Sequence, residues 1–361
     1  MSKPARALFF ASLTALLAAS APSTSAPNIR PEEPSRGLQG DAQPLSVMTY
    51  NVMGLPWPLA FGRDEALDQI ADRLVALRAQ GRQPHVVLLQ EAFLADPARF
   101  ARRAGYAHVA AGPGVDAPAT ATPSGTDATF LRGARWDRGE TLPKQLSSGL
   151  LILSDHPIVR VDRFAYPAFA CAGFDCLANK GALIAHLAVP GVAAPVSIVN
   201  THLNARKAAG VPFARSLAAF DRQVALLTRF VGRHVPQGRM MILGGDLNIG
   251  RDPQRGGAFF TRWRAAGQAF VAASLGGGGR ALADLAVADP AERRDLAEAV
   301  ARRKDWLFAR DGDGTPMRVV RAQVPFGGDA DARLSDHVGY AVSYAPAGAE
   351  RSPRFAAVER R

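Results

Sequence analysis

The chain has 361 residues, of which 48% are hydrophobic and 21% are charged. This composition is typical of a globular protein with a sizeable core, and it excludes a low-complexity or collagen-like chain. The formal net charge is +11 at neutral pH, which favours polyanionic partners such as nucleic acid or anionic lipid. The basic residues are spread along the whole chain, so charge alone does not select a partner.

The N-terminus is predicted to be an export signal. Lys3 and Arg6 precede an apolar run from Ala7 to Leu17, and small residues follow it, as signal peptidase requires. The run has about eleven residues, fewer than the roughly 20 that span a bilayer as a helix. We therefore expect a signal peptide at 1–26, cleaved between residues 20 and 26, and a secreted or periplasmic protein. An uncleaved membrane anchor is the alternative.

After a proline-containing leader at 27–44, predicted to be disordered, the sequence predicts a folded domain over 45–345 and a flexible tail at 346–361. Apolar strand patterns alternate there with helical ones. Strands are expected at 46–52, 85–90, 149–153, 181–189, 196–201, 240–244, 306–309 and 338–344, and helices at 65–80 and 214–231. Segments 112–128 and 273–280 read as surface loops. Pairs of adjacent strands between helices favour mixed sheets with helices outside.

The chain has two cysteines, Cys171 and Cys176, five positions apart. In an exported protein, such a pair is typical of a disulfide that closes a small loop. A short loop of this kind fixes local shape more than global stability.

Polar side chains follow or precede most of the predicted strands, at the points where the strands end. They are Asn51, Glu91, His202, Asn204, Asp246, Asn248, Asp305, Asp336 and His337. Any one of them is more often a loop cap or a surface group. Together they predict a site where a rigid scaffold brings distant side chains to one place.

The oxygen donors among these residues suit a hard cation such as Mg²⁺, Mn²⁺ or Ca²⁺. They are Glu91, Asp246, Asn51 and Asn248. The scarcity of cysteine and the lack of clustered histidines argue against a structural or catalytic zinc site. The imidazoles of His202 and His337 can bind phosphoryl oxygens or transfer protons near neutral pH. Asp305 is predicted to orient His337 through the other ring nitrogen.

Seven segments then form an ordered set that resembles the endonuclease/exonuclease/phosphatase superfamily. They are Tyr50-Asn51, Gln90-Glu91, 148–154 (SGLLILS), 200–203 (NTHL), 245–248 (GDLN), 305–308 (DWLF) and 335–337 (SDH). The resemblance covers roughly residues 45–345 and implies a four-layer α/β/β/α sandwich of two packed mixed sheets with flanking helices. It also implies a metal-dependent phosphodiester hydrolase, in which water attacks the phosphorus in line.

Roles for the site residues follow from the same resemblance. Glu91 is the implied principal metal ligand with Asn51 nearby, and Asp336 adds a further carboxylate to the metal side. Asp246 and Asn248 are implied to hold the nucleophilic water, the phosphate or a second metal.

The two histidines have implied roles at the phosphate. His202 contacts it, while His337, oriented by Asp305, acts as general base or phosphate ligand and is counted with the metal-binding groups as well. Whether His337 or Asp246 takes the proton of water is left open, as is the number of metals.

Within the superfamily, the segment 171–181 and the stretch 201–205 are similar to bacterial sphingomyelinases. This similarity implies substrate contacts by Lys180 and Asn204; for Lys180, a solvated lysine at a strand start is the alternative. We expect a monomeric phospholipid phosphodiesterase with peripheral membrane contact, although no Trp- and Phe-rich hairpin is evident in the sequence.

Three other functions stay open on the sequence alone. The basic balance and the Arg-rich segments 132–138 and 251–264, read as loops, suit a secreted endonuclease or exonuclease that acts on DNA or RNA. An inositol phosphate monoesterase is less favoured, since no dedicated lysine and arginine cluster is seen. A non-catalytic binding protein on the same fold is the alternative from another class.

Overall fold

The structure is a computed structural model, and it describes residues 43–56, 59–267, 287, 289–314, 317–329 and 333–345. The predicted signal peptide at 1–26, most of the predicted leader at 27–44, the predicted loop at 273–280 and the predicted tail at 346–361 lie outside these residues. The described strands run from Leu45 to Ala345.

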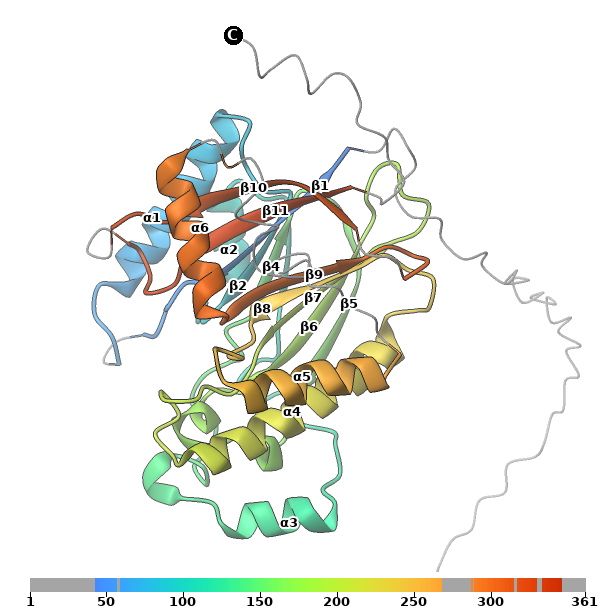
Figure 1. Cartoon of the computed structure of the whole chain (residues 1–361). Coiled ribbons are helices and arrows are strands. Elements are labelled where there is room, and N and C mark those ends of the chain that lie inside the picture. Colours follow the sequence, from blue (N-terminus) through green and yellow to red (C-terminus); the bar gives the residue numbers. More distant parts are fainter. Residues whose placement is uncertain are drawn as a thin grey trace, which may run out of the picture. The chain divides into compact units, whose positions relative to one another are not determined.

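Within the described residues, two mixed sheets pack face to face (Figure 1). In spatial order, the first consists of β10 (Arg318–Phe326), β11 (Gly339–Ala345), β1 (Leu45–Asn51), β2 (Val86–Gln90), β4 (Leu151–Ser154) and β3 (His108–Ala111). The second consists of β5 (Ile158–Ala165), β6 (Gly181–Leu187), β7 (Val196–His202), β8 (Met241–Asp246) and β9 (Asp305–Arg310). The β1–β2 and β7–β8 pairs are parallel, and the other pairs are antiparallel.

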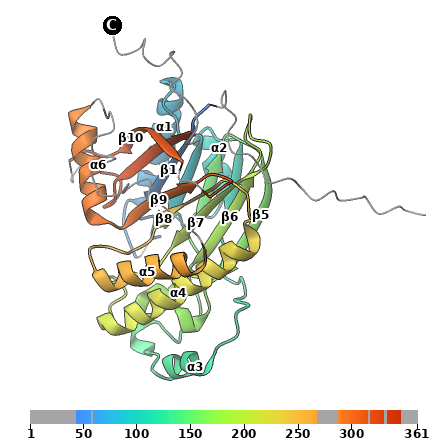
Figure 2. The same cartoon turned by 45° about the vertical axis from the view of Figure 1, so that its right-hand side comes forward.

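Helices cover the outer faces of both sheets. Helices α1 (Arg63–Ala79) and α2 (Pro97–Arg103) pack on the first sheet, while α4 (Phe213–His234) and α5 (Pro253–Ala265) pack on the second (Figure 2). Helix α6 (Pro290–Arg302) packs beside β10 and β9 and adds apolar side chains to the core between the sheets. Helix α3 (Gly125–Arg132) lies beyond α4. The predicted four-layer α/β/β/α sandwich is confirmed.

The central strands are buried on both faces, and alternate side chains serve different cores. In β8, Ile242 faces the core between the sheets, whereas Met241 and Leu243 pack under the helices of the second sheet. This explains why these strands read as continuous apolar runs in the sequence rather than as alternating patterns. Burial from both sides also makes them the rigid part of the scaffold.

Strands β3, β5 and β10 were not predicted, and all three lie at sheet edges. An edge strand has a neighbour on one side only, and most side chains of β5 are at least partly exposed. It therefore carries charged residues such as Arg160 and Arg163 where a buried strand would be apolar. Two predicted loops also need correction. Helix α3 occupies the end of the predicted loop 112–128, and helix α5 occupies most of 251–264 because Asp252 caps its N-terminus.

Among the described residues, no helix combines the length and the apolar character needed to cross a bilayer.

A buried polar contact joins the two sheets. The Gln90 side chain, at the end of β2, donates to Asn200 Oδ1 of β7 at 2.9 Å. The Asn200 amide in turn donates to the carbonyls of Leu89 and Leu151, each at 2.9 Å. Both side chains are fully buried, so this network fixes how the strands of one sheet are placed against those of the other.

Candidate active site

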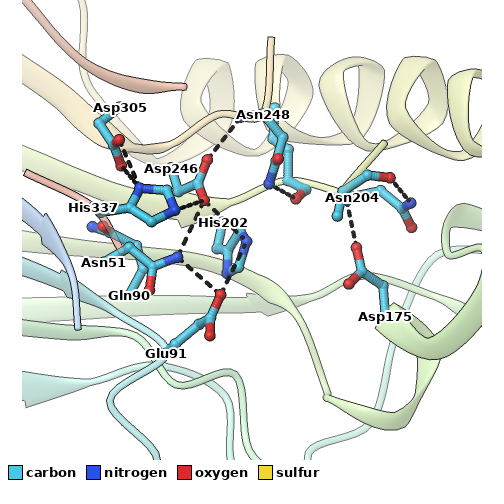
Figure 3. Close-up of polar contacts among 12 residues, drawn as sticks. Asn51, Gln90, Glu91, Asp175, His202, Asn204, Asp246, Asn248, Asp305 and His337 are labelled. Carbon is cyan, nitrogen blue, oxygen red and sulfur yellow. Dashed lines mark hydrogen bonds and ion pairs between the residues drawn. The ribbon is translucent and has the colours of Figure 1, made fainter. Parts of the chain in front are cut away.

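The two parallel strand pairs end at the same place, and the predicted site residues meet there. Asn51 pairs with Gln90 at the ends of β1 and β2, and His202 pairs with Asp246 at the ends of β7 and β8. Asp305, at the start of β9, pairs with Asp246 across the antiparallel step. Strand ends therefore bring side chains from far-apart positions in the sequence into one cluster (Figure 3).

Asp246 lies at the centre of this cluster. Its Oδ2 accepts a hydrogen bond from Asn51 Nδ2 at 3.1 Å and lies 3.5 Å from His202 Nε2 and 3.8 Å from His337 Nε2. Asn51 Nδ2 also donates to Glu91 Oε1 at 2.9 Å, so one amide bridges two carboxylates. The Asn51 Oδ1 atom meanwhile accepts from the Met53 backbone N–H at 3.0 Å. The prediction that Asn51 binds the metal stays a prediction.

Glu91 is presented by a strained backbone. Its φ of 54° lies in the left-handed region, which a residue with a side chain rarely adopts. Gly54 makes the conformation accessible, because a Cβ there would lie 2.6 Å from the Glu91 carbonyl oxygen. The Glu91 side chain is 22% exposed, compared with 3% for Asp246. Glu91 is therefore the carboxylate of this pair that is open to an incoming ligand.

His337 and Asp305 form a buried pair behind Asp246. His337 Nδ1 lies 2.7 Å and 3.0 Å from the two carboxylate oxygens of Asp305, and the Tyr340 hydroxyl donates to the Asp305 carbonyl. This pairing places the proton on Nδ1 and leaves Nε2 facing Asp246. The predicted orientation of His337 by Asp305 is thus present in the structure.

The cluster shifts the pKa values of its members in different directions. Burial lowers the pKa of His337, but the charge and hydrogen bond of Asp305 outweigh it and raise the pKa to about 9. Burial raises the pKa of Asp305, although the neighbouring imidazole of His337 lowers it in part. The pair therefore holds its shared proton tightly. Burial would also raise the pKa of Asp246, yet His202 and His337 hold it well below its ordinary value. Burial, and then Lys180, lower the pKa of His202.

Lys180 connects this cluster to the disulfide loop. Its Nζ lies 3.2 Å from His202 Nε2 and donates to Asp175 Oδ2 at 2.9 Å. Asp175 lies inside the loop closed by the Cys171–Cys176 disulfide, whose Cα atoms are 5.3 Å apart. The predicted disulfide is present, and Lys180 is a buried lysine rather than a solvated one.

Asn248 and Asn204 are both buried, and their side chains have structural partners. Asn248 follows strand β8 and has a φ of 48°. Its Nδ2 donates to the Leu203 carbonyl, and its backbone N–H donates to Asp246 Oδ1. Asn204 Oδ1 accepts from the Ala172 N–H, and its Nδ2 donates to the Ala205 carbonyl. These contacts tie Asn204 to the disulfide loop, and its substrate contact stays a prediction.

Asp336 lies at the rim of the cluster. Its side chain is largely exposed, with Oδ1 3.9 Å from His337 Nε2. Among the described residues, the side chains of Asp246, Asp305 and His337 are close enough together to hold a metal ion. Both oxygens of Asp305 are already engaged by His337, so Asp246 together with the more exposed Glu91 fits a hard cation better. Both cysteines are in the disulfide, so no thiolate competes.

Sequence reasoning did not assign Asp175, Asn200 or Ser335 to the site. Asp175 was visible as the acidic residue between the two cysteines, and Asn200 as an amide within an apolar strand. Ser335 Oγ donates to the Asn51 carbonyl at 2.7 Å and receives the His337 N–H at 3.2 Å. Each of these residues acts through a contact with a distant part of the chain, which no local pattern shows.

Comparison with known proteins agrees with this geometry. Residues 48–337 match the Endonuclease/Exonuclease/phosphatase family. Among curated proteins, none matches the chain in sequence.

Several solved structures share the fold. A double mutant of beta toxin from Staphylococcus aureus with bound magnesium ions has 16% identity and a TM-score of 0.54, covering 84% of this chain and 99% of its own. SmcL has 18% identity and a TM-score of 0.53, covering 84% and 99%. Sphingomyelinase C from Streptomyces griseocarneus has 20% identity and a TM-score of 0.52, covering 83% and 99%. At these identities, the likeness concerns the fold.

Proposed function

Since this chain belongs to the endonuclease/exonuclease/phosphatase family of metal-dependent phosphoesterases, we propose that it is an exported phosphodiesterase that hydrolyses a phospholipid of the sphingomyelin type. The observation that carries the phosphodiesterase part is the convergence of Glu91, Asp246, His202 and His337. These donors come from four separate segments, and they combine hard oxygen ligands with imidazoles, as phosphoryl transfer to water requires.

In the proposed reaction, Glu91 and Asp246 would hold Mg²⁺, and Mn²⁺ or Ca²⁺ are the alternatives to be tested. Such a cation would supply positive charge beside the phosphoryl oxygens. His202 and Lys180 face the phosphate, and His337, fixed through Nδ1 by Asp305, presents Nε2 to the reacting atoms. Water would attack the phosphorus in line, and the bond to the leaving alcohol oxygen would break. The proton of water would pass to Asp246 or to the neutral form of His337, which is a small fraction at neutral pH because its pKa is about 9.

The choice of a lipid rests on exposed apolar side chains in loops that are connected to the site. Among the described residues, five of the seven exposed large hydrophobic side chains lie in three loops: Leu59, Phe61, Trp136, Leu142 and Phe174. Phe61 and Trp136 are 79% and 76% exposed, which is costly in water and favourable at a lipid interface.

Each of these loops is connected to the site. The loop with Phe61 follows Asn51 directly, and the loop with Trp136 leads to Gly149, whose carbonyl accepts from the Ala92 N–H beside Glu91. Phe174 adjoins Asp175, the partner of Lys180. A lipid surface that contacts these three loops would meet the molecule at the site. The likeness in fold to a sphingomyelinase C supports the same substrate class.

The second candidate is a secreted nuclease, favoured by the net charge of +11. Purified mature protein should be assayed with Mg²⁺, and with EDTA, on sphingomyelin vesicles, plasmid DNA and soluble inositol phosphates. Release of phosphocholine without nicking of DNA is the expected result. Nicking of DNA without hydrolysis of vesicles would overturn the lipid assignment.

Two sets of variants separate catalysis from surface binding. Glu91→Gln should abolish hydrolysis of every substrate. Activity that survives both this change and EDTA would exclude the proposed chemistry. A folded wild-type protein without activity would favour the non-catalytic binding protein. Phe61→Ser and Trp136→Ser should lower vesicle hydrolysis roughly 10- to 100-fold without changing hydrolysis of bis-p-nitrophenyl phosphate, since each removes roughly 1.5–3 kcal/mol of apolar contact. Val159→Ser, at an exposed position on β5, is the matched control.

Export is tested separately. The full chain should be expressed in a host with a secretion pathway, and the mass of the protein outside the cytoplasm should be measured. Removal of a segment that ends within residues 20–26 is expected, and retention of the intact chain in the membrane would contradict it.

A further inference from the structure

The side chain of Arg63 connects two loops that hold opposite sides of the site. Its Nε donates to the Met53 carbonyl at 2.7 Å, and its Nη2 donates to the Val52 carbonyl at 2.8 Å. The same Nη2 donates to the Leu334 carbonyl at 2.6 Å. Val52 and Met53 follow β1, whereas Leu334 precedes β11, so one guanidinium joins segments about 280 residues apart in the chain.

Each loop leads by a short chain of hydrogen bonds to a site residue. On one side, the Met53 N–H holds Asn51 Oδ1, and Asn51 Nδ2 bridges Glu91 and Asp246. On the other side, Leu334 precedes Ser335, whose hydroxyl binds both the Asn51 carbonyl and the His337 N–H. Arg63 thus lies where the Glu91 side and the His337 side of the site are joined.

The local sequence of helix α1 is poorly explained by helix stability alone. Arg63 is the first residue of α1, where the helix dipole disfavours a positive charge. The preceding Gly62 has a φ of 67° and offers no side-chain cap. A residue that opposes a local preference and has a distant partner is expected at functional sites. The guanidinium is compensated by the three carbonyls that it binds.

We propose that Arg63 is a positioning residue that fixes the spacing between the carboxylates Glu91 and Asp246 and the imidazole of His337. A lysine cannot replace it, because an ammonium lacks the planar fork that reaches both loops at once. The proposal rests on the phosphodiesterase chemistry of the family but not on the lipid substrate. Its tests therefore use a soluble substrate and metal binding, which a failed lipid assignment leaves unaffected.

Arg73 offers a matched control on the same helix. Its Nε donates to the Pro325 carbonyl of β10 at 2.6 Å, and its guanidinium lies over the Phe326 ring. It therefore anchors α1 to the sheet, as Arg63 does, without contacting either of the two loops. Arg63→Ala and Arg73→Ala should lower the melting temperature by similar amounts.

The two variants should differ in function. For Arg63→Ala, we expect kcat on bis-p-nitrophenyl phosphate to fall roughly 10- to 100-fold with a smaller change in KM, since misplacement by about 1 Å has effects of this size. The Kd for Mg²⁺, measured by calorimetry without substrate, should rise several-fold. Arg73→Ala should keep both values within about twofold. Addition of about 50 mM guanidinium, far below denaturing concentrations, should restore part of the kcat of Arg63→Ala.

A kcat and a Mg²⁺ Kd for Arg63→Ala equal to those of Arg73→Ala would overturn the proposal and leave Arg63 as a simple anchor. Should Arg63→Ala not fold, Arg63→Lys decides, because it keeps the charge of the side chain. A several-fold loss of kcat and of Mg²⁺ affinity in the lysine variant supports the proposal, and wild-type values in it refute it.

Discussion

The two ends of strand β2 both carry charged and imidazole groups, yet these groups behave in opposite ways. At the catalytic end, His337 pairs with Asp305 and its pKa rises to about 9. At the opposite end, burial lowers the pKa of His85. Asp155 raises this pKa in part, and Arg78 lowers it. The ring of His85 lies 5.5 Å from that of His156, whose pKa is lowered by burial as well.

The partners of the carboxylates explain the difference. Asp305 is bound to His337 by both oxygens, whereas Asp155 forms an ion pair with Arg78. His85 Nδ1 instead accepts a hydrogen bond from the Ser46 backbone N–H at 3.1 Å, which favours the neutral ring. The charge of each imidazole therefore depends on the group that the fold places beside its Nδ1 atom. A carboxylate there favours the cationic ring, and a backbone N–H favours the neutral ring. The following predictions test this contrast, from the largest expected effect to the smallest.

Asp246→Asn should lower kcat/KM on bis-p-nitrophenyl phosphate by roughly 10³-fold or more, because it removes a proposed cation ligand that is also the partner of two histidines. Asp155→Asn, the corresponding change at the opposite end, should leave kcat/KM within about twofold. Steady-state kinetics with saturating Mg²⁺ measures both. Equal losses in the two variants would mean that the catalytic end is wrongly located.

Asp305→Asn should lower kcat roughly 10²- to 10⁴-fold, since His337 loses the group that fixes its tautomer. The pKa of His337 should fall from about 9, because the charge and the hydrogen bond of Asp305 no longer oppose burial, while Asp246 and Asp336 still raise it. Titration of the imidazole signals by nuclear magnetic resonance, in metal-free buffer, measures the change. An unchanged pKa would show that another group raises it.

Asn200→Leu should destabilise the protein by about 3 kcal/mol, because it removes three buried hydrogen bonds, one from the Gln90 amide and two to the carbonyls of Leu89 and Leu151. Ser46→Ala, which removes the hydroxyl that accepts from the His85 N–H at 2.8 Å, should cost only about 1 kcal/mol. Urea denaturation measures both differences, provided that the dependence of the unfolding free energy on urea concentration is the same in both variants and in the wild type. A loss below about 1 kcal/mol for Asn200→Leu would mean that the sheets are positioned without this network.

The smallest expected effect is a pH dependence of stability with one sign for His85 and His156 at one end and the opposite sign for His337 at the other. The lowered pKa values of His85 and His156 mean that the unfolded chain binds more protons just below pH 6.5, so stability decreases as pH falls through that range. The raised pKa of His337 gives a contribution that is fully present below pH 6.5 and is lost as pH rises through about 9.

Urea denaturation in EDTA at pH 5.5, 7 and 9.5 measures these slopes. His85→Asn, which keeps an acceptor for Ser46 but does not titrate, should reduce the acid-side loss by less than about 1 kcal/mol, because solvent screens a partly exposed ring. An acid-side slope that is identical in the variant would exclude His85 as its source.

The sequence by itself predicted the four-layer fold, the central strands and the set of residues at their ends. Strands buried on both faces, such as β2 and β8, are continuous apolar runs, and polar residues that interrupt them at their ends are easily recognised. The order of the motifs added the family. Edge strands such as β5 escaped prediction because solvent on one side removes the requirement for apolar side chains.

Only the tertiary structure decided how the site residues act on one another. Asp305 raises the pKa of His337, Asp175 holds Lys180 and Arg63 joins two loops through contacts between segments that are distant in sequence. Hydrogen bonds and charge interactions depend on separations of a few ångströms. A linear pattern does not contain these separations, because they are fixed by how the two sheets pack and where their strands end.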